Sequence, residues 1–139
     1  MFSGNFLDTE GKIIGKHKGT VHYTIGQRKG LGLAFGKPMY VKQINPTNNT
    51  VTLSEEKDLY SDTLIAKEFN WISGKEPEEP IYCKAKIRYR QKEQQATAYP
   101  MDNGNVKIVF EEPQRAITPG QAVVLYDGDI VLGGGRIIR

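Results

Sequence analysis

The stretch Ile81-Tyr82-Cys83-Lys84-Ala85-Lys86-Ile87-Arg88-Tyr89-Arg90 alternates apolar or aromatic residues with cationic ones. Because successive side chains of a strand point to opposite faces, this alternation predicts a β-strand with one buried and one solvated face. Cys83 falls on the predicted buried face, together with its odd-numbered neighbours. The predicted solvated face carries four cations, namely Lys84, Lys86, Arg88 and Arg90.

Similar runs of β-branched and aromatic residues recur along the chain, each closed by turn residues. Such runs, in the absence of helical periodicity, predict an all-β protein. The turn sequences Asp102-Asn103-Gly104 and Asp127-Gly128 predict two hairpins, and only Leu59–Lys67 is expected to contain a helical turn. The expected strands are Thr20–Ile25, Met39–Ile44, Thr50–Leu53, Ile81–Tyr89, Gln95–Tyr99, Val106–Phe110, Ala122–Tyr126 and Asp129–Leu132.

A charged segment with two prolines, Gly74–Pro80, divides the chain into two pieces. Proline cannot donate to a strand ladder, and the segment has no side chain suited to a core. We therefore expect a small β domain over residues 1–73, a linker over residues 74–80 and a C-terminal antiparallel β-barrel over residues 81–139. A closed barrel is expected because closure removes the exposed edges of a short meander.

Composition limits the classes of function without choosing one. The 139 residues include 19 Lys and Arg against 16 Asp and Glu, which gives a net charge of +3. This mild excess permits a polyanionic partner, but a mixed solvated surface explains it more simply. The one cysteine and two histidines exclude an internal disulfide and do not predict a zinc site. No apolar run approaches the roughly 20 residues of a membrane helix, and we expect no membrane partner and a cytoplasmic setting.

The cationic stripe of the Ile81–Arg90 stretch suits a nucleic acid. Cations on one face of a strand stand about 6.6–6.8 Å apart, which is comparable with the phosphate spacing along a nucleic-acid strand. Arg88 could bind phosphate through its planar fork, and Tyr89 could reach a base. An equally good interpretation is a solvated barrel face whose lysines discourage edge pairing.

Two further segments could contact an anion. The basic, glycine-rich loop Gly26–Gly32 carries Arg28 and Lys29, although it lacks the spacing of known nucleotide loops and a plain turn is its commoner meaning. Gln121 follows the Pro119-Gly120 turn, where its amide could point outward to a base or phosphate, or could close the loop.

Taken in order along the chain, these motifs resemble one family, the tRNA-specific 2-thiouridylases, which thiolate the wobble uridine of certain tRNAs. The resemblance runs from about Gly4 to Ile138, so it covers nearly the whole chain. The matching motifs are Tyr23–Gly32, Asn70–Ile72, Lys86–Gln91, Glu112–Ala116, Thr118–Val123 and Leu132–Gly135.

The resemblance implies a fold and a division of labour. Residues 1–73 would be the family's central β domain, and the barrel, similar to those of translation factors, would grip the tRNA. Family enzymes also have an N-terminal catalytic domain with an ATP loop and two active cysteines, one of which receives a persulfide sulfur from a donor protein. This chain has one cysteine and no phosphate loop, so the resemblance implies a fragment that binds no cofactor and is inactive alone.

Matched position by position, the resemblance implies tRNA contacts at Arg88, Tyr89 and Gln121. We add Arg28 and Lys29 as candidate contacts with RNA or with another domain of the same enzyme. No catalytic residue and no metal ligand is expected. Two alternatives stay open, namely a structural or protein-interaction barrel with incidental RNA contact, and a free-standing enzyme that uses Cys83.

Overall fold

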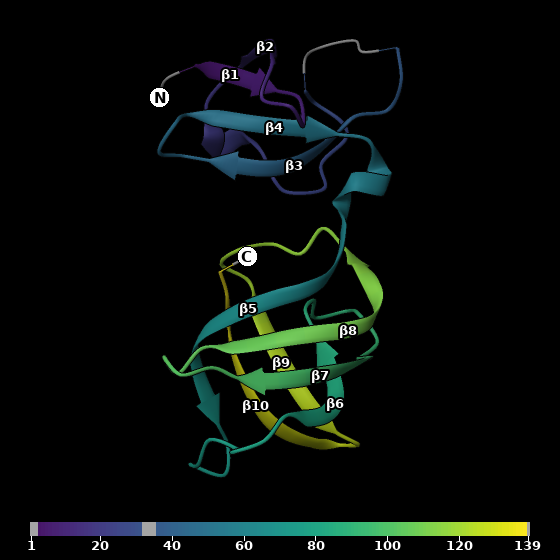
Figure 1. Ribbon diagram of the computed structural model, residues 1–139. Helices are drawn as coiled ribbons and strands as arrows, with labels where there is room; N and C mark the ends of the chain where they lie inside the picture. Colours follow the sequence, from purple (N-terminus) through teal and green to yellow (C-terminus); the bar gives the residue numbers. More distant parts are fainter. Residues whose placement is uncertain (1–2, 32–35, 139) are drawn as a thin grey trace. The chain divides into compact units, whose positions relative to one another are not determined.

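The computed structural model describes residues 3–31 and 36–138. The chain folds into two compact units, Met1–Tyr60 and Ser61–Arg139 (Figure 1). The first contains a four-stranded sheet and the second is a closed six-stranded barrel. The all-β fold with a C-terminal antiparallel barrel, predicted from the sequence, is therefore confirmed.

The first unit contains a sheet with the strand order β2-β1-β4-β3. β1 runs parallel to β4, whereas the other neighbours are antiparallel. A core that includes Phe6, Val41 and Leu53 holds the sheet, since these side chains are fully buried. The elements are β1 (Gly4–Leu7), β2 (Ile13–His17), η1 (Thr20–His22), β3 (Tyr40–Asn45), β4 (Thr50–Ser54) and η2 (Glu56–Leu59).

The strand expected over Thr20–Ile25 is wrong, because the chain forms the short 3-10 helix η1 at this point. The backbone N–H of Tyr23 bonds back to the carbonyl of Thr20, which closes a local turn instead of a strand ladder. The β-branched residue Val21, which favoured a strand, is two-thirds exposed. Tyr23 instead packs in the core and its hydroxyl accepts a bond from the Lys18 N–H.

The second unit is a closed barrel with the strand order β10-β5-β8-β7-β6-β9. Along β6, buried and more exposed side chains alternate as the sequence predicts. The barrel interior is filled by small and apolar side chains such as Ala85, Ala98 and Leu125. A Cβ on Gly135 would lie 2.8 Å from the Lys67 carbonyl, so this glycine permits close packing of β10 on β5. The strands are β5 (Tyr60–Trp71), β6 (Ile81–Lys86), β7 (Gln94–Pro100), β8 (Val106–Arg115), β9 (Ala122–Asp127) and β10 (Ile130–Ile137).

The strand β5 is the main difference from the sequence expectation. It belongs to the barrel, although residues 1–73 were expected to form the first domain and Leu59–Lys67 a helical turn. The boundary between the two units therefore falls at Tyr60 and Ser61, and Gly74–Pro80 lies within the connection from β5 to β6. In the barrel β5 lies between β8 and β10, both distant from it in the sequence, and local patterns do not reveal such pairing.

Candidate nucleic-acid interface

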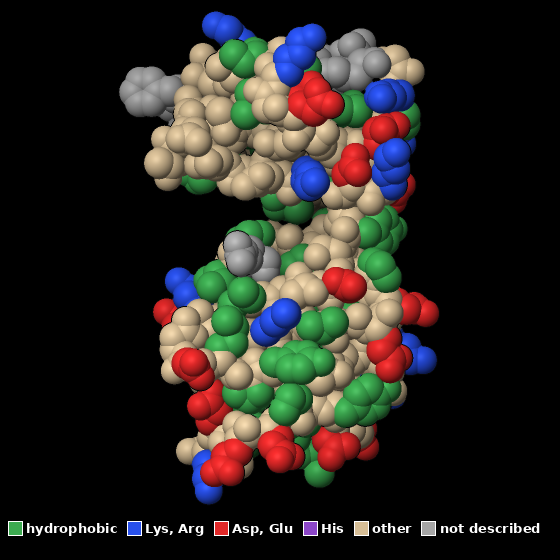
Figure 2. Space-filling view, viewed as in Figure 1, with side chains coloured by type: hydrophobic (Ala, Val, Ile, Leu, Met, Phe, Trp, Pro, Cys, Tyr) green, Lys and Arg blue, Asp and Glu red, His purple; other side chains and the backbone are tan. Residues whose placement is uncertain are grey.

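The two ends of the barrel differ in charge. The β6–β7 and β8–β9 connections lie at one end, called here the basic end, and they carry Arg88, Arg90 and Lys92 against a single acid, Glu93. Three connections at the opposite end, the acidic end, carry one cation, Lys75. Acidic side chains gather over that end (Figure 2), namely Glu76, Glu78, Glu79, Asp102, Asp127 and Asp129.

The strand β6 ends at Lys86, so the predicted single ladder of four cations is wrong. Lys84 and Lys86 lie on the strand, whereas Arg88 and Arg90 lie on the turn that follows it. The strand ends because the Ile87 N–H donates to the side-chain Oε1 of Gln91, 3.1 Å away, instead of to a neighbouring strand. The cations at this end therefore come from a strand and a turn.

Arg88 ties the β6–β7 turn to the β8–β9 connection. Its Nη2 donates to the carbonyl oxygens of Arg115 and Ala116, both 2.6 Å away. Partial burial, followed by the charge of Arg115, lowers the pKa of Arg88, but a guanidinium remains charged in a protein. The hydroxyl of Thr118 donates to the same Ala116 carbonyl at 2.8 Å. Arg88 therefore fixes the local backbone while it keeps its charge at the basic end.

Tyr89 projects from the turn and is 92% exposed. The Nζ of Lys86 lies 5.8 Å from the centre of its ring, within the range of a cation–π contact. The inward orientation that strand alternation gave Tyr89 does not apply, since the residue lies beyond the end of β6. An exposed ring beside a cation is the combination that proteins use to stack bases of single-stranded RNA.

Gln121 lies at the same end of the barrel, with its side chain exposed. Its backbone is fixed on both sides, because its N–H bonds to the Thr118 carbonyl at 3.2 Å and its carbonyl accepts from the Ile137 N–H at 2.8 Å. The pairing of Lys86 with Val124 sets the end of β6 beside the start of β9. The basic end therefore carries all three residues for which the resemblance implied tRNA contacts.

Arg28 and Lys29 are exposed and belong to the first unit. The side chain of Gln27 closes their loop, since its Oε1 accepts from the Thr24 N–H and its Nε2 donates to the Lys29 carbonyl. Gly32, the last residue of this motif, is outside the described residues. The loop is a compact basic turn, and its role as an RNA or interdomain contact stays a prediction.

Two glutamines at the basic end were missed by the sequence reasoning. The Nε2 of Gln91 donates to the Oε1 of Gln114 at 2.8 Å, and the Nε2 of Gln114 donates to the Glu112 carbonyl at 2.9 Å. Gln114 is only 6% exposed. Gln114 shares the even-numbered register of Ile108 and Phe110, but Glu112 in that register is exposed, so strand alternation does not single Gln114 out.

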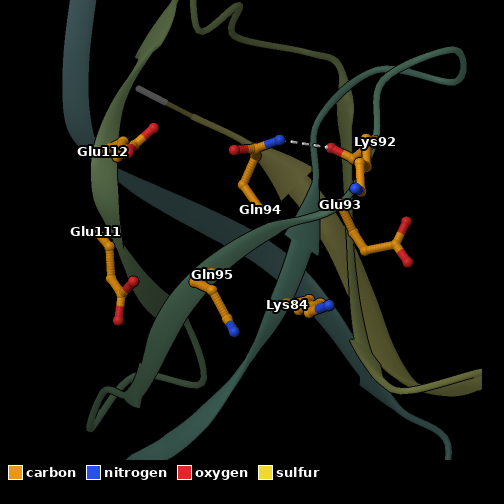
Figure 3. Close-up of a pocket in the computed structure, with 7 residues that line it drawn as sticks. All are labelled: Lys84, Lys92, Glu93, Gln94, Gln95, Glu111 and Glu112. Atoms are coloured by element: carbon orange, nitrogen blue, oxygen red, sulfur yellow. Dashed lines mark hydrogen bonds between the residues drawn. The ribbon is translucent and has the colours of Figure 1, made fainter.

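A shallow pocket of about 290 Å³ lies on the barrel wall and is lined by side chains of both charges (Figure 3). Its mixed lining does not select an anion. In the described ranges 3–31 and 36–138, no group of three or more His, Cys, Asp or Glu side chains is arranged to hold a metal ion. The lining residues are Lys84, Lys92, Glu93, Gln94, Gln95, Glu111 and Glu112.

Cys83 is 5% exposed and faces the barrel interior, as the alternation predicted. Burial is the main cause that raises the pKa of its thiol to about 11. The thiol is therefore protonated at neutral pH and shielded from solvent, and both properties oppose a nucleophilic role.

The part of the chain that the structure describes includes no helix with the length and apolarity that a bilayer crossing requires.

Comparison with known proteins identifies both units. The family model of the aminomethyltransferase β-barrel domain matches residues 61–137, and that of the tRNA methyl transferase PRC-barrel domain matches residues 1–55. Over 134 residues, or 96% of the chain, it is 59% identical to the tRNA-specific 2-thiouridylase MnmA of Acetivibrio thermocellus and 58% identical to that of Clostridioides difficile. The chain spans 37% of the length of each of these relatives.

Proposed function

The chain belongs to the family of tRNA-specific 2-thiouridylases, and we propose that it is the part of such an enzyme that grips tRNA, through the basic end of its barrel. The observation that carries the proposal is the joint position of Arg88, Tyr89 and Gln121 at one end of the barrel, on segments fixed by hydrogen bonds. A charged fork, an exposed ring and an amide together suit a phosphate, a base face and a base edge.

The whole enzyme would carry out ATP-dependent 2-thiolation of the wobble uridine, with the sulfur delivered as a cysteine persulfide. The ATP site and the active cysteines would belong to a catalytic domain N-terminal to the residues described, and the persulfide donor would be a separate partner. Its partners would then be tRNA, that catalytic domain and the sulfur donor, in the cytoplasm. Arg28 and Lys29 would contact RNA or the catalytic domain. The barrel's contribution would be to hold the substrate, because multivalent contact raises affinity without new chemistry.

The competing proposal is a structural or protein-interaction barrel that touches RNA incidentally. The low net charge of +3 favours it, since such an excess gives little nonspecific attraction. Under this alternative, the chain would bind tRNA no more tightly than an unrelated barrel of the same net charge.

The experiment compares two triple variants of the 139-residue chain by fluorescence anisotropy with a labelled tRNA transcript at low salt. Arg88→Ala/Tyr89→Ala/Gln121→Ala is expected to weaken binding by roughly tenfold or more, because it removes the proposed phosphate, stacking and base-edge contacts. The matched control, Lys75→Ala/Tyr99→Ala/Gln95→Ala, removes a cation, a tyrosine and a glutamine from elsewhere on the barrel. Equal affinity of the first variant and the wild type would refute the proposed role of the basic end.

A further inference from the structure

The turn that carries Arg88 and Tyr89 receives little support from the barrel ladder. β6 ends at Lys86 and β7 begins at Gln94, and within the turn the Gln91 N–H bonds to the Arg88 carbonyl at 3.2 Å. A short turn with an exposed tyrosine would sample several backbone conformations unless other groups held it. The contacts that hold it therefore decide how well Tyr89 is placed for binding.

The Gln91–Gln114 pair provides such contacts. The Oε1 of Gln91 accepts a hydrogen bond from the Ile87 N–H at 3.1 Å, and its Nε2 donates one to the Oε1 of Gln114 at 2.8 Å. Gln114 in turn donates to the Glu112 carbonyl at 2.9 Å, so a continuous series of bonds links the end of β6 to β8. Since Gln114 is nearly fully buried, loss of the Gln91 amide would leave the Oε1 of Gln114 without its donor in a place that water barely reaches.

The Gln91–Gln114 pair lies beside the hydrogen bonds that the Arg88 guanidinium makes to the backbone. Arg88 reaches the Arg115 and Ala116 carbonyls, which directly follow Gln114. Ala116 has a φ of 53°, a conformation that costs a non-glycine residue energy, and its carbonyl accepts bonds from both Arg88 and Thr118. The β6–β7 turn and the β8–β9 connection are thus held together by side chains, and each depends on the other.

We propose that Gln91 and Gln114 are positioning residues, which contact no RNA but hold Arg88 and Tyr89 in the arrangement that binds tRNA. This inference rests on the proposed function of the basic end. It predicts that the glutamines affect RNA affinity only through the two residues that they position. Such dependence appears as energetic coupling between the sites, whereas independent sites give additive effects.

The test is a double-mutant cycle with the 139-residue chain and a labelled tRNA transcript. Gln114→Leu keeps the side-chain volume and removes the amide, and we expect roughly three- to tenfold weaker binding. In an Arg88→Ala/Tyr89→Ala background, the same change is expected to alter affinity by less than about 1.5-fold. Gln95→Leu, at an exposed position on β7, is the matched control and should leave affinity unchanged in both backgrounds. Equal losses in the two backgrounds, or no loss in the first, would overturn the proposal.

A second measurement needs no RNA and keeps the proposal falsifiable if Gln114→Leu unfolds. In Gln91→Ala, amide hydrogen exchange at Ile87 should accelerate by roughly tenfold or more, while Ala85, paired within the barrel ladder, should exchange as before. Unchanged exchange at Ile87 would show that the pair does not hold the turn. If the wild-type chain binds no tRNA, the proposed function fails, and the exchange measurement alone decides whether the glutamines order the turn.

Discussion

The two ends of the barrel are built from the same strands and differ in what their connections carry. At the basic end, the side chain of Arg88 on the β6–β7 connection bonds to the backbone carbonyls of Arg115 and Ala116. The acidic end has six carboxylates, and its longest connection, Ile72–Pro80, is exposed over most of its length. A binding surface requires fixed groups, so this contrast favours the basic end as the surface for the proposed tRNA contact.

The two ends also differ in the sign of their local charge. The charge of the barrel is unevenly placed, because the connections at one end carry mainly cations and those at the other end carry mainly carboxylates. The basic end of the barrel would attract a polyanion, and the acidic end would repel it. Composition averages over this arrangement and cannot reveal it.

Charge reversal at the basic end should have the largest effect. Arg90→Glu/Lys92→Glu alters two exposed cations of the β6–β7 connection and should weaken tRNA binding at low salt by roughly thirtyfold, or about 2 kcal/mol. The control Lys75→Glu/Lys107→Glu makes the same change in net charge at exposed positions on or near the acidic end and should cost less than about threefold. Similar losses in the two variants would mean that net charge, not its location, drives binding.

Between the two ends, the buried thiol of Cys83 is expected to take no part in chemistry. The pH dependence of the free energy of unfolding tests this expectation. The thiol pKa is raised from 9.0 to about 11 in the folded chain, chiefly by burial. Below pH 9 both states hold the proton, and as the pH rises towards 11 the unfolded chain loses its proton first. The free energy of unfolding should therefore fall by about 1–2 kcal/mol across this range.

Urea unfolding at several pH values, compared with Cys83→Ala, isolates this contribution because the two chains share every other titratable group. The expected result is a smaller decline of stability in the variant. An identical decline, together with rapid alkylation of Cys83 in the native chain, would reopen the interpretation of this residue as a nucleophile.

Neutralising the acidic end should have the smallest effect. Glu76→Gln/Glu78→Gln/Glu79→Gln removes three exposed carboxylates and is expected to raise tRNA affinity by less than about twofold. The reason is that salt screens charges separated by more than about 10 Å at moderate ionic strength. An increase of fivefold or more in the same anisotropy assay would place the acidic end against bound RNA and would remove the contrast.

Much of the barrel could be predicted from local patterns. The alternation in the Ile81–Arg90 stretch correctly gave a strand with Cys83 inside, since period-two burial depends only on neighbouring residues. The strand β5 could not be assigned to the barrel, because its neighbours β8 and β10 are distant in the sequence and pairing over such distances leaves no local pattern. For the same reason, the boundary between the two units lies at Tyr60 and Ser61 and not near residue 73 as expected.

The site was predictable in its residue types and not in its geometry. The end of β6 at Lys86 depends on a bond between Ile87 and the side chain of Gln91, a contact that no strand pattern contains. For the same reason, the clamp formed by Arg88 is invisible in the sequence, although its charge is plain. Burial of Gln114 could not be predicted either, because Glu112, in the same register of β8, is exposed.

The most direct test of RNA recognition by the basic end is amide hydrogen exchange across the 139-residue chain, with and without a tRNA transcript. We predict slower exchange on binding in the Arg88–Gln91 turn and at Gly120 and Gln121, with no change in the Met101–Asn105 connection at the acidic end. Slower exchange at the acidic end, with the Arg88–Gln91 turn unaffected, would contradict the account.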